Sequence, residues 1–214
     1  MNILNNKIYE NLDLLPYDLQ GWNGDKPIFK ELINEVKPTT IVEIGTWKGQ
    51  SAINMGKICK ELGLQTKIYC IDTWLGSLEF WHGLNDTKER DLMLKNGYPN
   101  VYYQFLSNVV HSGLQDVIIP VPLPSSIGIK LLYQLNIKPE LVYIDGSHDY
   151  NDVTIDLVSV YKYLVYKDNI VFGDDYKTFS DVKIAVDFFN TDYFVIDREF
   201  KDNFWIFRNK EFLL

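Results

Sequence analysis

The chain has 214 residues, of which 46% are hydrophobic and 23% are charged, so one domain with a substantial core is expected. Its formal net charge of −8, without a basic run, argues against a nucleic-acid partner. No apolar stretch is as long as a transmembrane helix, which needs about eighteen residues, so no membrane partner is expected. The N-terminus lacks the pattern of a signal peptide, and Cys59 and Cys70 have neither zinc spacing nor disulfide density. We therefore expect a cytoplasmic protein.

Strand-like and helix-like segments alternate along the chain, which predicts a mostly parallel sheet. Residues 1–26 have little periodicity and are expected to form an N-terminal arm or lid. In chain order, we then expect a helix over 27–36, a strand over 40–44, a helix over 51–62, a strand over 67–72, a helix over 101–114, a strand over 117–121, a helix over 127–135, a strand ending at Asp145, a helix over 152–164, a strand ending at Asp174, a helix over 181–190, and two strands over 193–196 and 203–208 that can pair antiparallel. Residues 75–100 interrupt the alternation, and a connection of this length predicts a substrate-side insertion within one domain, 1–214.

The segment 41–51, IVEIGTWKGQS, has the pattern of a strand, a glycine turn and a helix start. Glycines let the backbone approach a ligand closely, and a helix start offers free N–H donors. The spacing E-x-G-x-x-x-G differs from the dinucleotide pattern, and a purely structural turn is the alternative. The next strand ends at Asp72, where an acid can bind both hydroxyls of a ribose or serve as a turn residue. Together, the two features favour a nucleoside site.

Three acids follow two further strands that are expected to be buried. Asp145 ends the run LVYID, and Asp174 and Asp175 end the run NIVFGDD. These strand ends form the edge where α/β sheets bind ligands, and neighbouring strand tips lie ~5 Å apart. Three close carboxylates either raise a pKa or bind a cation, for which Mg²⁺ or Mn²⁺ is the best match. The alternative is a solvated turn at Asp174 and Asp175, since both acids can reach one cation only if the strand ends between them.

The segments VEIGTWKGQSA, CIDTW, VPLPSS, VYIDGSHDY and FGDDY, in this order, resemble the motifs of class I S-adenosylmethionine-dependent methyltransferases over roughly residues 40–176. The pair IDGSHDY and GDDY is more narrowly similar to the metal-dependent sugar O-methyltransferases of macrolide and aminocoumarin pathways, the macrocin O-methyltransferase-like group, and to the cephalosporin-hydroxylase-like group. The resemblance implies a Rossmann-like α/β fold, in which helices cover both faces of a mostly parallel seven-stranded sheet with a final antiparallel strand.

The resemblance also implies a role for each matching residue. S-adenosylmethionine would contact three groups: Glu43, Gly45, Thr46, Trp47, Gly49 and Ser51 at its methionine part, Asp72, Thr73 and Trp74 at its ribose, and Ser125 and Ser126 at its adenine. Mg²⁺ or Mn²⁺ would be held by Asp145, Asp174 and Asp175, with Asp145 also a catalytic residue. His148 matches the general base, whereas some relatives carry an acid at the position of Ser147.

Several of these side chains have simpler alternatives. His148 can accept a proton near neutral pH, because an unperturbed imidazole has a pKa of ~6.5, but it can also cap the next helix. The candidate contacts of the substrate that accepts the methyl group are Trp81, His82 and Tyr176. For aromatic residues of an insertion, packing is the alternative role. Trp22 either covers the cofactor or packs against its neighbours.

The function implied by the resemblance is Mg²⁺-dependent O-methylation of a sugar or glycan hydroxyl. A catechol or another small phenol is the alternative acceptor. A catalytically silent cofactor-binding domain of a larger glycan-assembling protein is the alternative from another class. A small molecule or glycan is thus the expected partner, and the sequence indicates no oligomeric state.

Overall fold

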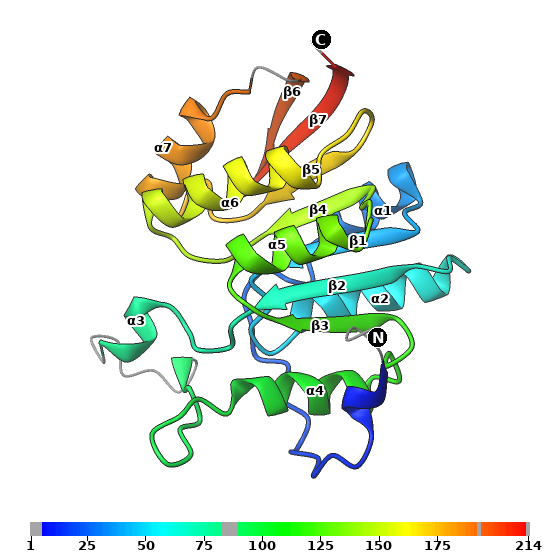
Figure 1. Ribbon diagram of the computed structural model, residues 1–214, viewed down its shortest axis with the longest axis vertical. Helices are drawn as coiled ribbons and strands as arrows, with labels where there is room; N and C mark the ends of the chain where they lie inside the picture. Colours follow the sequence, from blue (N-terminus) through cyan, green and yellow to red (C-terminus); the bar gives the residue numbers. More distant parts are fainter. Residues whose placement is uncertain (1–5, 83–89, 192–193, 213–214) are drawn as a thin grey trace.

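The computed structural model describes residues 6–82, 90–191 and 194–212 (Figure 1). Their strands form one seven-stranded sheet with the order β3-β2-β1-β4-β5-β7-β6. The strands are β1 Thr40–Ile44, β2 Lys67–Asp72, β3 Ile118–Pro122, β4 Leu141–Ile144, β5 Ile170–Gly173, β6 Phe194–Lys201 and β7 Phe204–Phe212. Strands β1 to β5 pair in parallel, and β7 is antiparallel to both β5 and β6. The predicted Rossmann-like sheet is therefore confirmed.

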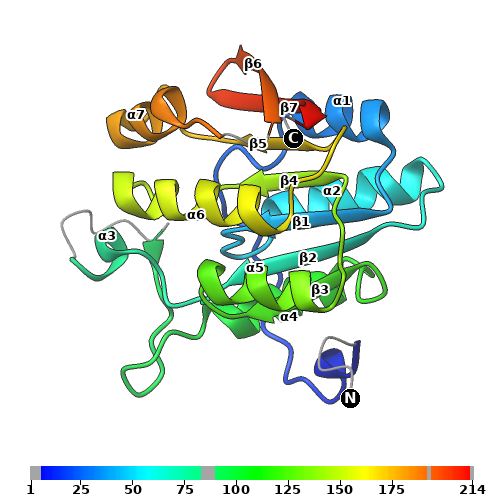
Figure 2. The same cartoon turned by 45° about the horizontal axis from the view of Figure 1, so that its top comes forward.

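Helices cover both faces of this sheet (Figure 2). They are the 3-10 helix η1 Asn6–Tyr9 and the α-helices α1 Pro27–Val36, α2 Gln50–Glu61, α3 Leu78–Trp81, α4 Val101–His111, α5 Ser125–Gln134, α6 Tyr150–Tyr163 and α7 Ser180–Phe188. One hydrophobic cluster joins α1, α2 and α4 to the sheet, and a second joins α5, α6 and α7 to the other face. Ile41 belongs to the first cluster and Val42 to the second, because successive strand residues point to opposite faces.

Element boundaries differ from the prediction mainly near turns and at the end of the chain. Helix α5 begins at Ser125, inside the expected PLPSS turn, with Pro124 as its N-cap. Helix α4 ends at His111, before the predicted end at residue 114. Strands β6 and β7 are longer than predicted because they pair with each other as a hairpin, while residue 193, the predicted start, lies outside the described residues.

The N-terminal arm lies across α4 and the start of α2. The backbone N–H of Leu15 donates to Ser107, and that of Asp18 donates to Asn108, each at 3.0 Å. The buried ammonium of Lys48 lies 2.7 Å from the carboxylate of Asp18. Within the described residues, no helix is long and apolar enough to cross a membrane.

Candidate active site

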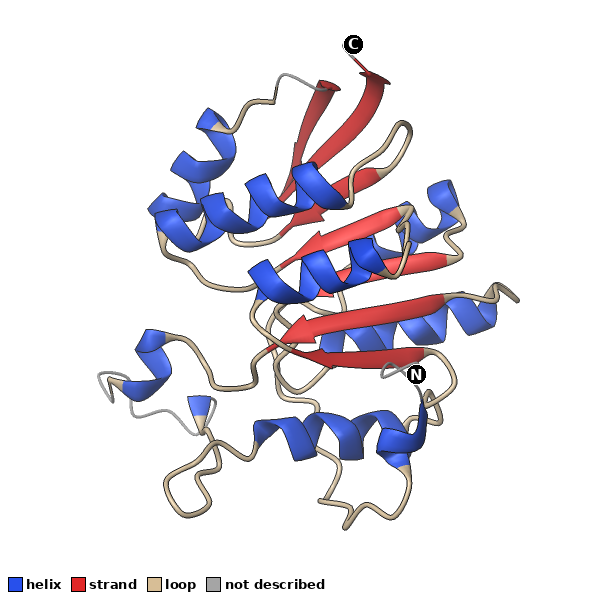
Figure 3. Ribbon diagram, viewed as in Figure 1, coloured by secondary structure: helices blue, strands red, loops and turns tan. Residues whose placement is uncertain are grey.

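The five parallel strands end at one edge of the sheet, where the loops to the following helices gather (Figure 3). A cavity of about 970 Å³ opens at this edge. Its walls are the ends of β1, β2, β4 and β5, the starts of α2, α5 and α6, and the short helix α3. The volume lies at the upper end of the ~300–1,000 Å³ range of ligand pockets.

The glycine turn after β1 forms one wall of the cavity. Gly45 has a φ of 78°, and a Cβ there would lie 2.0 Å from the carbonyl oxygen of Asp145, so only glycine fits. The carboxylate of Asp72 accepts the backbone N–H of Thr46 at 2.8 Å and that of Trp47 at 3.0 Å. Asp72 therefore holds the turn in place in addition to facing the cavity.

Glu43 lies beneath this turn and does not line the cavity. Its carboxylate is fully buried and accepts hydrogen bonds from Thr46 Oγ1, at 2.9 Å, and from Ser51 Oγ. Burial raises the pKa of Glu43 to about 7, although these two hydrogen bonds favour the charged form. Its contacts join the glycine turn to the start of α2.

The predicted cofactor residues divide into a lining group and a supporting group. Those on the cavity surface are Gly45, Thr46, Trp47, Ser51, Asp72, Thr73, Ser125 and Ser126. Glu43, Gly49 and Trp74 lie behind the wall. Gly49 faces the Phe105 ring, and Trp74, which is 2% exposed, donates from its indole nitrogen to the carbonyl of Trp47 at 2.8 Å.

The structure brings Asp145, Asp174 and Asp175 to the same cavity. Strands β4 and β5 end at Ile144 and Gly173, which are register partners, so the acids that follow them start side by side. Asp175 has a φ of 67°, a left-handed conformation that Asp tolerates better than most residues. The strand therefore ends before both Asp174 and Asp175, and strand alternation no longer separates them.

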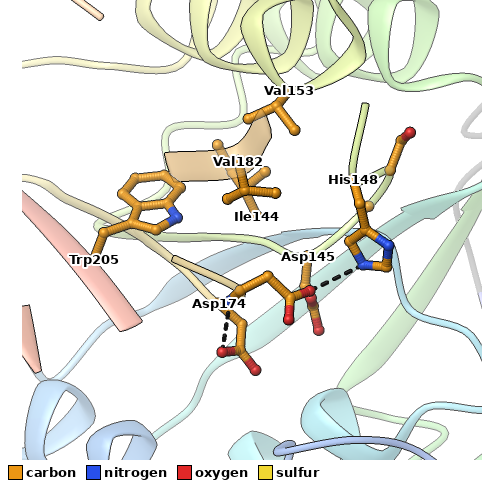
Figure 4. A pocket seen from close by; sticks show the side chains of 10 residues that line it. Ile144, Asp145, His148, Val153, Asp174, Val182 and Trp205 are labelled. Atoms are coloured by element: carbon orange, nitrogen blue, oxygen red, sulfur yellow. Dashed lines mark hydrogen bonds and ion pairs between the residues drawn. The ribbon is translucent and has the colours of Figure 1, made fainter. Parts of the chain in front are cut away.

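Hydrogen bonds and mutual repulsion set the charge of this group. Asp145 accepts from the hydroxyl of Tyr143 at 2.9 Å, and Asp174 accepts from the amide nitrogen of Asn203 at 2.7 Å. Burial, with the negative charges of Asp175 and Asp174, raises the pKa of Asp145 well above its usual range. Burial also raises the pKa of Asp174 to about 6. Figure 4 shows Asp145, Asp174 and His148 close together, with the apolar side chain of Trp205 opposite.

His148 lies between two carboxylates. Its Nε2 is 2.9 Å from Asp175 Oδ2, and its Nδ1 is 2.9 Å from Glu79 Oε1. The ring stacks on Phe179, with ring centroids 3.8 Å apart and an angle of 7° between the planes. Burial favours the neutral ring, but the hydrogen bond and charge of Asp175, with the charges of Glu79 and Asp145, raise the pKa of His148 above its usual value.

Helix capping, the alternative role of His148, belongs to its neighbour. Asp149 is the N-cap of α6, and its side chain accepts the backbone N–H of Asn151 at 2.9 Å. The imidazole of His148 is thus free of that role and faces the cavity.

The donor chemistry of the acids fits a hard cation, because carboxylate oxygens predominate and because burial, with their mutual repulsion, raises the pKa of Asp145. Over residues 6–82, 90–191 and 194–212, no group of three or more His, Cys, Asp or Glu side chains is arranged to hold a metal ion. Asp174 is hydrogen-bonded to Asn203, and Asp175 to His148. The structure thus supplies the donors without a formed metal centre among the described residues.

The residues predicted to contact the methyl acceptor are Trp81, His82 and Tyr176, and none of them lines the cavity. The indole nitrogen of Trp81 donates to the carbonyl of Leu75 at 2.8 Å. Tyr176 donates its hydroxyl to Asp187 at 2.6 Å and lies away from the cavity, and His82 is exposed. Residues 83–89 of the insertion lie outside the described residues.

Other aromatic side chains line the cavity instead. Trp22 stacks on Phe80 with centroids 6.4 Å apart, and Trp47 lies 4.8 Å from Phe80. We call Trp22, Trp47 and Phe80 the aromatic wall. Trp22 therefore packs against its neighbours and also faces the cavity.

Among the described residues, sequence reasoning missed four acids that line the cavity, Glu79, Asp149, Asp152 and Asp156. Asp156 is 6% exposed and accepts from the hydroxyl of Ser125, and burial raises its pKa to about 6. Its spacing from Val153 and Val160 places it on the buried face of α6, so a charged residue at a core position was the available signal. Glu79 carries no such local signal.

The fold and the site together define a class of protein. The chain belongs to the family described as "Methyltransferase domain", whose model matches residues 42–176. A comparison with curated proteins finds no match.

Solved O-methyltransferase structures share the fold. The O-methyltransferase from Bacillus cereus, solved with SAH, has a TM-score of 0.59 and 14% identity over 95% of this chain and 88% of that one. The O-methyltransferase NovP has a TM-score of 0.60 and 16% identity over 86% and 78% of the two chains. TomG from Streptomyces achromogenes, an O-methyltransferase solved with SAM, has a TM-score of 0.59 and 13% identity over 92% and 84%.

Proposed function

We propose that this protein transfers a methyl group from S-adenosylmethionine to a hydroxyl of a sugar or glycan. The observation that carries the proposal is one cavity that contains the glycine turn with Asp72 at one end and His148 with Asp145, Asp174 and Asp175 at the other. Membership of the methyltransferase family supports it. The O-methyltransferases from Bacillus cereus and TomG, which were solved with SAH and SAM, point the same way.

The cofactor would lie over the ends of β1 and β2. Asp72 would accept hydrogen bonds from the ribose, a contact typical of an acid at the end of a second strand. Ser125 and Ser126 at the start of α5 would lie at the adenine, and Gly45 would let the methionine part approach the backbone. This placement would direct the sulfonium methyl toward the ends of β4 and β5.

His148 is the proposed general base. A sugar hydroxyl is a poor nucleophile at neutral pH, so its proton must leave as the oxygen attacks the methyl carbon. S-adenosylmethionine would supply the methyl carbon and leave as a neutral thioether, while the imidazole of His148 would keep the proton. Mg²⁺ or Mn²⁺, held by Asp145, Asp174 and Asp175, would supply positive charge that lowers the pKa of the acceptor hydroxyl.

A panel assay tests the proposal. The purified protein is incubated with S-adenosylmethionine, Mg²⁺ and either free sugars and glycosides or catechols, and the methylated products are measured with and without EDTA. Metal-dependent methylation of a glycoside is the expected result. Methylation of catechols alone would favour the phenol alternative. No turnover with any acceptor, despite measurable binding of S-adenosylmethionine, would favour the silent binding domain.

A further inference from the structure

Helix α3 brings a second carboxylate to the proposed base. Glu79 lies 69 residues before His148 in the chain, yet its Oε1 is 2.9 Å from the Nδ1 of the imidazole. The Glu79 side chain is 31% exposed and that of His148 is 22% exposed, so water only partly screens the contact. This pair joins the segment after β2 to the loop after β4.

Two contacts fix the helix that carries Glu79. The next residue, Phe80, packs into the aromatic wall against Trp22 and Trp47. Trp81 donates its indole N–H to the carbonyl of Leu75 and so closes the turn that leads into α3. Glu79 is therefore held at a defined position beside the imidazole.

The position of Glu79 matters because a neutral imidazole carries one N–H and one lone pair. The hydrogen bond at one ring nitrogen decides which nitrogen keeps the proton. A carboxylate at Nδ1 favours the tautomer with Nδ1–H and leaves the Nε2 lone pair to accept a proton. Asp175 at Nε2 favours the opposite tautomer, and both contacts measure 2.9 Å.

We propose that Glu79 is the positioning residue for His148, which it holds through Nδ1 so that Nε2 is the basic nitrogen facing the acids of the cavity. The stacking of Phe179 on the ring fixes its plane, and the Glu79 hydrogen bond fixes its rotation within that plane. This inference rests on the proposed function, in which His148 is the base. Because both carboxylate contacts measure 2.9 Å, the tautomer of the ring decides which nitrogen is the basic one.

Nuclear magnetic resonance of the histidine rings tests the positioning directly. The chain contains three histidines, so a protein labelled with ¹⁵N at histidine gives three sets of ring signals, and the His148→Gln variant assigns one of them. At about pH 9, where the rings are expected to be neutral, wild-type His148 should be the Nδ1–H tautomer. Glu79→Leu should shift it toward Nε2–H, whereas Glu79→Gln, which keeps an acceptor oxygen, should retain Nδ1–H.

Two controls separate positioning from general damage. Glu61→Gln changes an acid of α2 whose side chain is 67% exposed, and it should leave the His148 tautomer unchanged. The signal of His111, which contacts the carbonyl of Leu15, reports whether each variant keeps the native fold. A wild-type Nε2–H tautomer, or an unchanged tautomer in folded Glu79→Leu, would overturn the proposal.

Kinetics give the second readout, with the acceptor that the panel assay identifies. Glu79→Leu should lower kcat about 10- to 100-fold, less than the ~10²–10⁴ loss expected for removal of the base, with little change in the KM for S-adenosylmethionine. Glu79→Gln should recover most of the rate. An unchanged kcat in Glu79→Leu contradicts the positioning role. If no acceptor is methylated, the proposed function fails, and the tautomer still decides the role of Glu79.

Discussion

The carboxylates at the two ends of the cavity differ in the groups that surround them. At the ends of β1 and β2, Asp72 accepts three backbone N–H groups, from Thr46, Trp47 and Trp74. We call this the nucleoside half. At the ends of β4 and β5, the acids face one another, and burial with mutual repulsion raises the pKa of Asp145. We call this the acidic half.

The difference shows what each half needs from a ligand. The nucleoside half is already organised by its own hydrogen bonds, so a cofactor would find a preformed surface. The acidic half concentrates negative charge, which only positive charge or protons can offset. We therefore expect the two halves to respond to different ligands and to fail independently when mutated.

Removal of divalent metal should have the largest effect. The proposal makes the acidic half dependent on a cation, so EDTA should reduce methyl transfer to background, and added Mg²⁺ or Mn²⁺ should restore it. The rate of product formation by EDTA-treated, desalted protein measures the effect. Full activity in metal-free protein would show that the acidic half needs no cation.

His148→Ala should have the next largest effect. Loss of the base should lower kcat by ~10²–10⁴, while the cofactor Kd stays near that of the wild type. The wild-type rate should fall as the pH drops below the pKa of His148, which the contacts to Asp175 and Glu79 raise, and this acidic limb should vanish in the variant.

The same variant distinguishes the acceptor classes. A phenol ionises more readily than a sugar hydroxyl, so a small loss of kcat, with the acidic limb retained, would favour catechol-type chemistry.

A smaller effect concerns Asp156, which lines the cavity but belongs to neither half. Burial raises its folded-state pKa to about 6, so the folded protein favours the neutral form more than the unfolded chain does. This favourable contribution is complete below the unfolded pKa of ~3.9 and is lost as the pH rises through about 6. Asp156→Asn should therefore raise the free energy of unfolding by on the order of 1–3 kcal/mol near pH 7.

Urea unfolding at several pH values measures this difference. The gain over the wild type should shrink toward about pH 4, where Asp156 is protonated in both states. Glu61→Gln, which changes an exposed acid of α2, is the matched control. A gain independent of pH would mean that Asp156 is not the titrating group.

Strand ends made the acids of the site predictable from sequence. Apolar runs closed by Asp place carboxylates at one edge of a parallel sheet, and the structure brings Asp145, Asp174 and Asp175 there. The order of the strands, and of the helices other than η1 and α3, followed from alternating periodicity in the same way. Glu43 was expected to contact the cofactor, but it shares the face of Ile41 on β1 and lies buried beneath the turn.

Contacts between distant segments were not predictable. The approach of Glu79 to His148 depends on how α3 packs on the aromatic wall, and no local pattern encodes that arrangement. The directions of Trp81 and Tyr176 likewise depend on their partners Leu75 and Asp187. Motif spacing identified candidate residues, whereas tertiary packing decided which side chains line the cavity.

Calorimetric titration of S-adenosylmethionine and of Mg²⁺ into two variants tests the independence of the halves most directly. Asp72→Asn should weaken S-adenosylmethionine binding by about 1–3 kcal/mol, because charge-assisted hydrogen bonds are lost, and should leave Mg²⁺ binding unchanged. Asp145→Asn should weaken Mg²⁺ binding and leave cofactor affinity near that of the wild type. If each folded variant lost both ligands, or if neither variant lost its own, the division into a nucleoside half and an acidic half would be contradicted.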